Sequence, residues 1–82
     1  MEESRIGVAA IIVEDMASAK AVNDVLHRFS KMIVGRLGIP YKERGVNVIS
    51  VVLDGNPDEI SALTGQLGKI SAVTVKAAMS KK

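Results

Sequence analysis

The sequence predicts an α+β fold in which the elements follow the order β-α-β-β-α-β. Two apolar runs, residues 5–14 and 46–53, are rich in β-branched residues and are typical of strands that are buried on both faces. Each run leads into an acidic helix entry, Glu14-Asp15 or Asp54, so segments 8–15 and 48–55 form a faint internal repeat. The 82 residues predict one domain, residues 1–82, because so short a chain has no room for a second core.

The first predicted strand, residues 5–14, leads into the longest helical pattern of the chain. Asp15 or Ser18 can cap this helix, because short polar side chains accept hydrogen bonds from the first free amides. From Ala21 to Ile33, apolar residues recur every three or four positions, with polar residues between them. This spacing predicts an amphipathic helix of about four turns.

Residues 34–41 predict a strand at the edge of the sheet. Proline has no amide hydrogen to donate to a central ladder, so Pro40 confines this strand to an edge. Residues 42–45 form a polar connection to the next strand, in which Gly45 can adopt a positive φ. Alternation along the strand predicts two sides, with Leu37, Ile39 and Tyr41 on one and Arg36, Gly38 and Pro40 on the other.

The second predicted helix begins at the strongest local signal in the chain. Asn56 is a favourable N-cap, Pro57 suits the first helical position, and Glu59 can accept a hydrogen bond from the amide of the cap. Apolar residues at helical spacing then mark one face of this helix: Ile60, Leu63, Leu67 and Ile70. Residues 72–79 end the pattern as an alternating strand with one face that is only partly apolar.

These elements predict a ferredoxin-like fold. Two right-handed βαβ units interlock into a four-stranded antiparallel sheet, and both helices lie on one face of that sheet. The strands at 5–14 and 46–53 should take the central positions, because both are apolar on their two faces. The strands at 34–41 and 72–79 should lie at the edges.

The sheet face opposite the helices is predicted to stay uncovered within one chain. On the first strand this face carries one of two alternating sets: Ile6, Val8 and Ile12, or Gly7, Ala9, Ile11 and Val13. With a matching set from residues 46–53, the patch would reach about 500 Å² or more, at or above the largest patches usual on monomers. We therefore expect a homo-oligomer formed through the sheet face, either a dimer or a tetramer.

The residue types that carry most catalytic and metal chemistry are scarce. The chain has no cysteine and one histidine, His27, so we expect no disulfide, no metal site and no other cofactor. His27 lies beside the apolar stripe of the first helix, where we expect a partly exposed structural histidine. The acidic pairs at 14–15 and 58–59 lie at helix starts, where negative charge complements the helix dipole. We therefore expect the chain not to be an enzyme.

The composition also limits the partners. Aromatic residues make up only 2%, so a base-stacking surface for single-stranded nucleic acid is not expected. A loose basic grouping surrounds the end of the first helix and the hairpin: Arg28, Lys31, Arg36, Lys42 and Arg44. We expect a solvated face here rather than direct DNA binding, which is kept as an alternative. The apolar run at 6–13 is too short to span a bilayer and the start is acidic, so we expect a cytoplasmic protein without membrane contact.

Residues 35–41, Gly-Arg-Leu-Gly-Ile-Pro-Tyr, have a composition that an edge strand does not require. Glycines permit close approach, and an arginine can pair with a carboxylate through two hydrogen bonds. The segment therefore suits a small anionic ligand or a seam between subunits, and we predict Arg36, Gly38 and Tyr41 as the first contacts. The alternative is that Pro40 and Arg36 only protect an exposed edge from unwanted pairing.

Four segments carry a family resemblance: residues 5–8, 34–41, 49–54 and 61–68, the last reading Ser-Ala-Leu-Thr-Gly-Gln-Leu-Gly. Together they resemble the family of proposed iron-only hydrogenase system regulators, which are small, stand-alone, ACT-like domains. The resemblance spans nearly the whole chain. It implies a regulatory role linked to hydrogenase maturation genes.

The chain is also similar to the C-terminal half of nickel-responsive repressors, from which it departs at two points. It lacks an attached ribbon-helix-helix segment and the set of His and Cys ligands, so the similarity implies neither operator binding nor nickel sensing. ACT domains often bind amino acids at a glycine-containing turn after the first strand. Here residues 14–17 contain no glycine, so that site is not carried over.

We expect a homo-oligomeric, transcription-associated, ACT-like regulator that senses a small molecule or a protein partner. A second hypothesis is a structural interaction module that binds a partner protein without any ligand. A third is direct DNA binding through the basic grouping, which predicts a steep dependence of affinity on salt.

Overall fold

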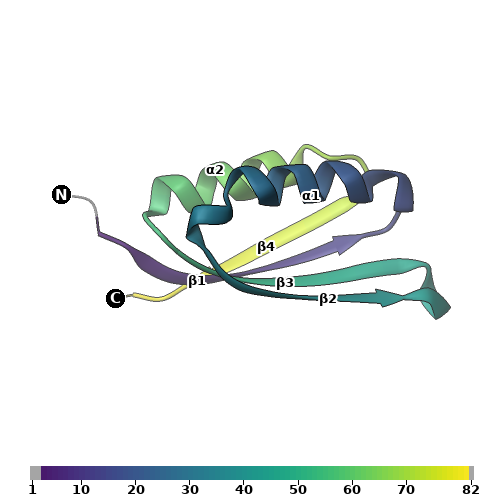
Figure 1. Ribbon diagram of the computed structural model, residues 1–82, viewed down its shortest axis with the longest axis horizontal. Coiled ribbons are helices and arrows are strands. Elements are labelled where there is room, and N and C mark those ends of the chain that lie inside the picture. The colour runs from purple at the N-terminus through teal and green to yellow at the C-terminus, as the bar shows by residue number, and fades with distance from the viewer. Residues whose placement is uncertain (1–2, 82) are drawn as a thin grey trace.

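The computed structural model describes residues 3–81 as two layers, a four-stranded sheet and a pair of helices on one of its faces (Figure 1). The strands and helices are β1 (Arg5–Val13), α1 (Ala19–Arg28), β2 (Ile33–Tyr41), β3 (Val46–Gly55), α2 (Pro57–Gly68) and β4 (Val73–Met79). Three short 3-10 turns connect them: η1 (Met16–Ser18), η2 (Ser30–Met32) and η3 (Lys42–Arg44). Both layers run along the length of an elongated molecule, whose Cα atoms extend over 44 × 19 × 17 Å.

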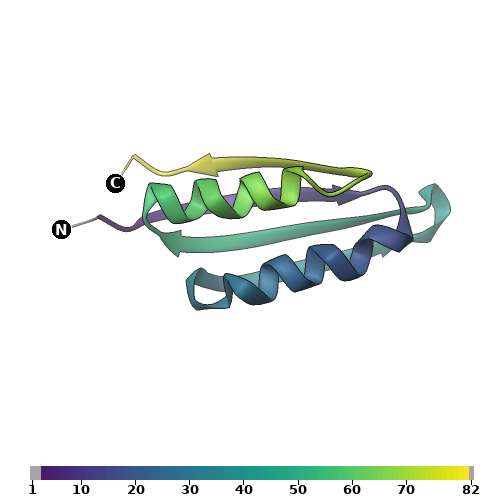
Figure 2. The ribbon, with the colours of Figure 1, turned by 90° about the horizontal axis from the view of Figure 1, so that it is seen from above.

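The strands form one antiparallel sheet in the order β2-β3-β1-β4. The two strands that are apolar on both faces, β1 and β3, take the centre as predicted, and Pro40 lies in an edge strand. The helices run antiparallel to each other above the sheet (Figure 2). The predicted ferredoxin-like α+β fold is confirmed.

The hydrophobic core lies between the sheet and the two helices. On β1, the residues Ala9, Ile11 and Val13 face the helices and are at most 1% exposed. The core is completed from β3, η2 and the helices by Ile49, Val51, Leu53, Met32, Val22, Val25, Leu26, Ile60, Leu63 and Leu67. Of the two alternating sets on the first strand, the one that begins with Gly7 therefore faces the helices. The set of Ile6, Val8 and Ile12 faces away from them.

The helix α1 is shorter than predicted. It ends at Arg28, so the prediction that it continues to Ile33 is wrong. Ile33 instead opens β2 and pairs with Leu53, which forces the chain to leave the helix earlier. The turn η2 buries Met32 against Gly55, where a Cβ atom would lie 2.8 Å from the methionine sulfur. Because a 3-10 turn keeps nearly the spacing of an α-helix, the apolar pattern continues past the end of α1.

The start of α2 is as predicted. Asn56 Oδ1 accepts a hydrogen bond from the Glu59 amide at 2.8 Å, and Glu59 Oε1 accepts one from the Asn56 amide at 3.2 Å. This reciprocal capping box satisfies two backbone donors at the helix start, and Pro57 occupies the first helical position. The hairpin between β2 and β3 closes at Gly45, which has the positive φ that the sequence predicts, 66°.

Candidate ligand pocket and open sheet face

The edge strand β2 places the three predicted site residues on two sides of the sheet. Arg36 pairs with Val51 and Gly38 with Ile49, and both partners are core residues, so Arg36 and Gly38 lie on the helix side. Tyr41 pairs with Val46, in register with the opposite face. The structure therefore brings Arg36 and Gly38 together and places Tyr41 on the other side of the same strand.

Arg36 and Gly38 line a shallow pocket of about 250 Å³ between β2, β3 and α1. The other lining residues are Asn23, Ile39, Pro40, Asn47 and Ile49. Arg36 Nη2 donates a hydrogen bond to Asn23 Oδ1 at 3.0 Å, and the arginine side chain is otherwise exposed. Among residues 3–81, no carboxylate forms an ion pair with Arg36. The guanidinium charge is therefore held in place by a neutral amide and stays available to an anion.

The two glycines of β2 are not needed by the fold of a single chain. A Cβ atom at Gly35 or at Gly38 would meet no other atom within 4 Å, and neither residue has a positive φ. By contrast, a Cβ at Gly7 would approach the Ala78 carbonyl oxygen to 3.2 Å. The missing side chains at Gly35 and Gly38 therefore leave the backbone of β2 accessible from outside the chain.

Two pocket residues, Asn23 and Asn47, were missed in the sequence. Asn23 lies beside the buried stripe of α1, on the flank that faces β2, and Asn47 pairs with Pro40 across the hairpin. The Asn47 side-chain amide donates a hydrogen bond to the sulfur of Met16 at 3.4 Å. Asn47 could have been identified from the sequence, because a turn at Gly45 sets the hairpin register that pairs Asn47 with Pro40. Asn23 could not be found without the position of α1 over the sheet.

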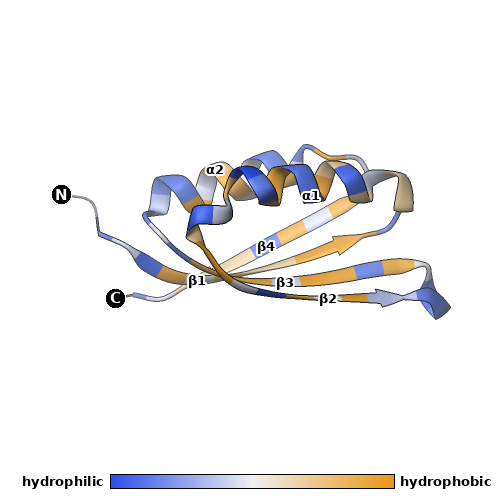
Figure 3. Cartoon of the chain, viewed as in Figure 1, coloured by the Kyte–Doolittle hydropathy of each residue, from blue (hydrophilic) through white to orange (hydrophobic). Residues whose placement is uncertain are grey.

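The face of the sheet away from the helices is apolar and uncovered. It carries large hydrophobic residues from three neighbouring strands: Ile6, Val8 and Ile12 of β1, Val48 and Val52 of β3, and Leu37, Ile39 and Tyr41 of β2, all 37% exposed or more. Figure 3 shows hydrophobic residues along β1, β2 and β3, whereas β4 is less hydrophobic. We call this set the open face. Its β4 residues are Thr74, Lys76 and Ala78.

Residues 5–77 match the model of the TM1266-like family, which is described as "Iron-only hydrogenase system regulator, putative". The chain belongs to this family. It is 41% identical to the uncharacterized protein TM1266 from Thermotoga maritima, with a TM-score of 0.93 over 96% of this chain and 100% of that one. The family resemblance carried by the four sequence segments is therefore confirmed. No curated protein sequence matches the chain.

More distant structures share the fold alone. The ACT domain of GTP pyrophosphokinase from Chlorobium tepidum is 16% identical, with a TM-score of 0.74 over 95% of this chain and 100% of that one. The C-terminal domain of the MgtC protein from Mycobacterium tuberculosis is 12% identical, with a TM-score of 0.74 over 99% and 93% of the two chains. These likenesses confirm that the family fold is ACT-like.

The basic residues do not form one surface. Arg28 and Lys31 lie where α1 leads into β2, whereas Lys42 and Arg44 lie in the hairpin at the far end of that strand (Figure 1). The nine residues of β2 separate the two pairs by about 30 Å at the usual rise of a strand. The grouping predicted around the helix end and the hairpin is therefore divided between the two ends of β2.

The side chains considered for catalysis either lie exposed on α1 or cap the start of a helix or 3-10 turn. His27 is exposed on α1, and Asp15 Oδ1 accepts a hydrogen bond from the Ala17 amide at 2.9 Å, which caps η1. Asp58 and Glu59 lie in the first turn of α2, where Glu59 completes the capping box.

Between residues 3 and 81, no group of three or more His, Cys, Asp or Glu side chains could hold a metal ion. In the same range, no helix is long and apolar enough to cross a membrane.

Proposed function

We propose that this chain is a homo-oligomeric regulatory domain of an iron-only hydrogenase system and that it senses a small anionic ligand at the Arg36 pocket. Membership of the TM1266-like family supports the regulatory part of the proposal. One observation carries the sensing part: the Arg36 guanidinium is held at the pocket by Asn23 without a carboxylate partner among residues 3–81.

The chemistry of the pocket suits a carboxylate or a similarly small anion. A guanidinium has five N–H donors and binds a planar carboxylate through two parallel hydrogen bonds. Asn23 occupies one donor of Arg36 and fixes the direction of the guanidinium. This lowers the conformational entropy that the Arg36 side chain loses when a ligand binds. Gly38 presents no side chain on this side of β2, so a ligand can approach the backbone closely.

The open face supports assembly. Its large apolar residues on three strands form the kind of patch that protein interfaces bury. In this proposal Tyr41 belongs to the seam between subunits, where it contacts the partner or a ligand held there. A ligand at the Arg36 pocket would change assembly only if it binds the free and assembled states with different affinities.

A second candidate function is a structural interaction module that uses the open face for a partner protein and holds no ligand. The same exposed apolar residues favour it, because a partner could cover them as well as a second copy could. The two candidates differ in what the purified protein carries.

Native mass spectrometry of freshly purified protein separates these candidates. The proposal expects oligomer masses with a reproducible extra mass, which Arg36→Gln removes. The matched control is Arg44→Gln, which removes an exposed cation from the distant hairpin and should keep the extra mass. Oligomers without any extra mass, together with saturable binding of a partner protein, would favour the interaction module. A monomer would contradict the role given to the open face.

A further inference from the structure

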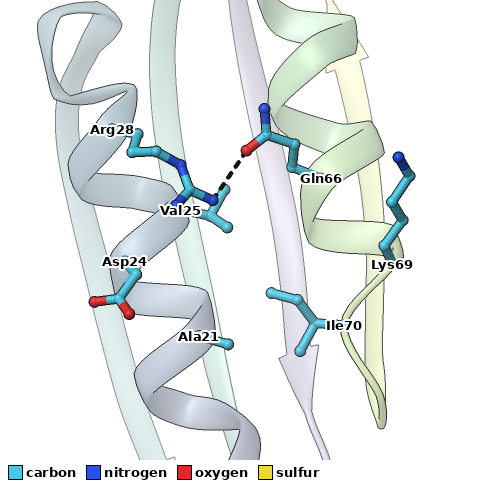
Figure 4. Close-up of a pocket in the computed structure, with 7 residues that line it drawn as sticks. All are labelled: Ala21, Asp24, Val25, Arg28, Gln66, Lys69 and Ile70. Atoms are coloured by element: carbon cyan, nitrogen blue, oxygen red, sulfur yellow. Dashed lines mark hydrogen bonds between the residues drawn. The ribbon is translucent and has the colours of Figure 1, made fainter.

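A second groove lies between α1 and α2, on the side of α1 away from the Arg36 pocket (Figure 4). Its volume is about 330 Å³. It is lined by Ala21, Asp24, Val25 and Arg28 of α1 and by Gln66, Lys69 and Ile70 at the end of α2. No feature of the proposed sensing function uses this groove.

The groove presents a single charge. Figure 4 shows Arg28 reaching from α1 toward Gln66 of α2, and Arg28 Nη2 donates a hydrogen bond to Gln66 Oε1 at 3.1 Å. The carboxylate of Asp24 points away from the groove and accepts a hydrogen bond from Lys20 Nζ at 3.0 Å. The ammonium of Lys69 also points away. The Arg28 guanidinium is therefore the charge that an occupant of the groove would meet.

The remainder of the groove is apolar. Ala21 and Val25 point from α1 toward the space between the helices, and Ile70 points toward it from the other side (Figure 4). Hydrocarbon side chains offer an occupant no hydrogen bonds, so they favour an apolar body. Arg28 is bonded only to a neutral carboxamide, and the amide nitrogen of Gln66 has no protein partner among residues 3–81. The groove thus combines N–H donors at one end with an aliphatic surface beside them.

We propose that this groove binds a monocarboxylate with a short aliphatic body. The carboxylate accepts hydrogen bonds from the Arg28 guanidinium and from the amide nitrogen of Gln66, and the hydrocarbon part lies over Ala21, Val25 and Ile70. One guanidinium balances one carboxylate, so a monoanion suits the groove better than a dianion. The site is separate from the Arg36 pocket, because Arg36 bonds to Asn23 on the other flank of α1.

Titration of the ¹⁵N-labelled protein with sodium hexanoate tests the proposal by NMR. Saturable shifts are expected for the amides of Val25, Arg28 and Ile70, with a Kd on the order of 1 mM for a ligand of this size. Hexanamide, which has the same shape without the charge, should bind at least about fivefold more weakly. Absence of saturable shifts, equal binding of hexanamide, or shifts confined to the Arg36 pocket would each overturn the proposal.

Variants at positions outside the hydrophobic core locate the site without threatening the fold. Arg28→Gln should weaken hexanoate binding about tenfold or more, and Gln66→Glu should abolish it by placing a carboxylate against Arg28. Arg44→Gln and Arg36→Gln remove the same charge at exposed positions that do not line the groove, and both should leave the Kd within about twofold. An unchanged Kd in Arg28→Gln, or equal losses in all three charge-removing variants, would contradict the site.

Discussion

The two faces of the sheet are built from alternate residues of the same strands, yet they have different surroundings. Ile11 is fully buried under the helices, while its neighbour Ile12 is 40% exposed on the open face. Both faces of β1 and β3 are apolar, although two helices can cover only one of them. The difference shows that the central strands carry more apolar residues than the core of one chain buries, and our proposal assigns the additional ones to assembly.

The largest expected effect compares these two neighbouring isoleucines. Ile11→Ala should lower the free energy of unfolding by about 2–5 kcal/mol, because it leaves a cavity in the core. Ile12→Ala should cost about 1 kcal/mol in a monomer and more where the protein is assembled. Urea denaturation at two protein concentrations measures both changes. If Ile12→Ala and Ile11→Ala lower the free energy of unfolding equally at every protein concentration, the two faces do not differ as proposed.

A charge on the open face should break the assembly. Val8→Lys places an ammonium in the middle of the apolar set, and we expect the dissociation constant to rise at least about 100-fold, or about 3 kcal/mol. Analytical ultracentrifugation measures the change. Ala62→Lys, at an exposed position of α2, adds the same charge on the helix layer and should leave the mass unchanged. Dissociation caused equally by both variants would argue against the open face as the interface.

Loss of the α2 cap should separate stability from assembly. Asn56→Ala removes one half of the capping box and should lower the free energy of unfolding by about 1 kcal/mol. The cap lies on neither face of the sheet, so the sedimentation mass at moderate concentration should stay the same. If this variant dissociates the assembly, then a small loss of stability is sufficient to cause dissociation. Dissociation of Val8→Lys would then no longer identify the open face as the interface.

The smallest expected effect compares the two glycines of β2. Gly35 pairs with Val52 on the open face, and Gly38 lies on the pocket side. Since a Cβ atom has room at both positions, either change to alanine should alter the stability of a monomer by less than about 1 kcal/mol. Gly35→Ala should weaken assembly, measured by ultracentrifugation, and Gly38→Ala should weaken only ligand binding. Weaker assembly in Gly38→Ala alone would reverse the roles assigned to the two sides.

The parts of the fold that local chemistry determines could be predicted from the sequence. Asn56, Pro57 and Glu59 define the start of α2, and Pro40 confines β2 to an edge. The end of α1 could not be predicted, because Met32 continues the helical spacing through a 3-10 turn. The sequence also could not show which face of β1 points away from the helices, since both alternating sets of its residues are apolar.

The candidate site was predictable only in part, for a geometric reason. The sequence indicates Arg36 and Gly38 through an unusual strand composition, and their shared side follows from the alternation of a strand. Asn23 and Gln66 become relevant only when α1 has a position relative to β2 and α2. Contacts between elements that are distant in sequence depend on packing, which no local pattern encodes.

The elongated shape of the molecule has a consequence for its hydrodynamics. The sheet runs along the 44 Å dimension, and its open face looks out along a short one. Copies that associate through that face stack along a short dimension and leave the long one unchanged. A particle assembled in this way would be rounder than its subunit, so its rotational diffusion should be less anisotropic and its frictional ratio lower than those of an end-to-end assembly.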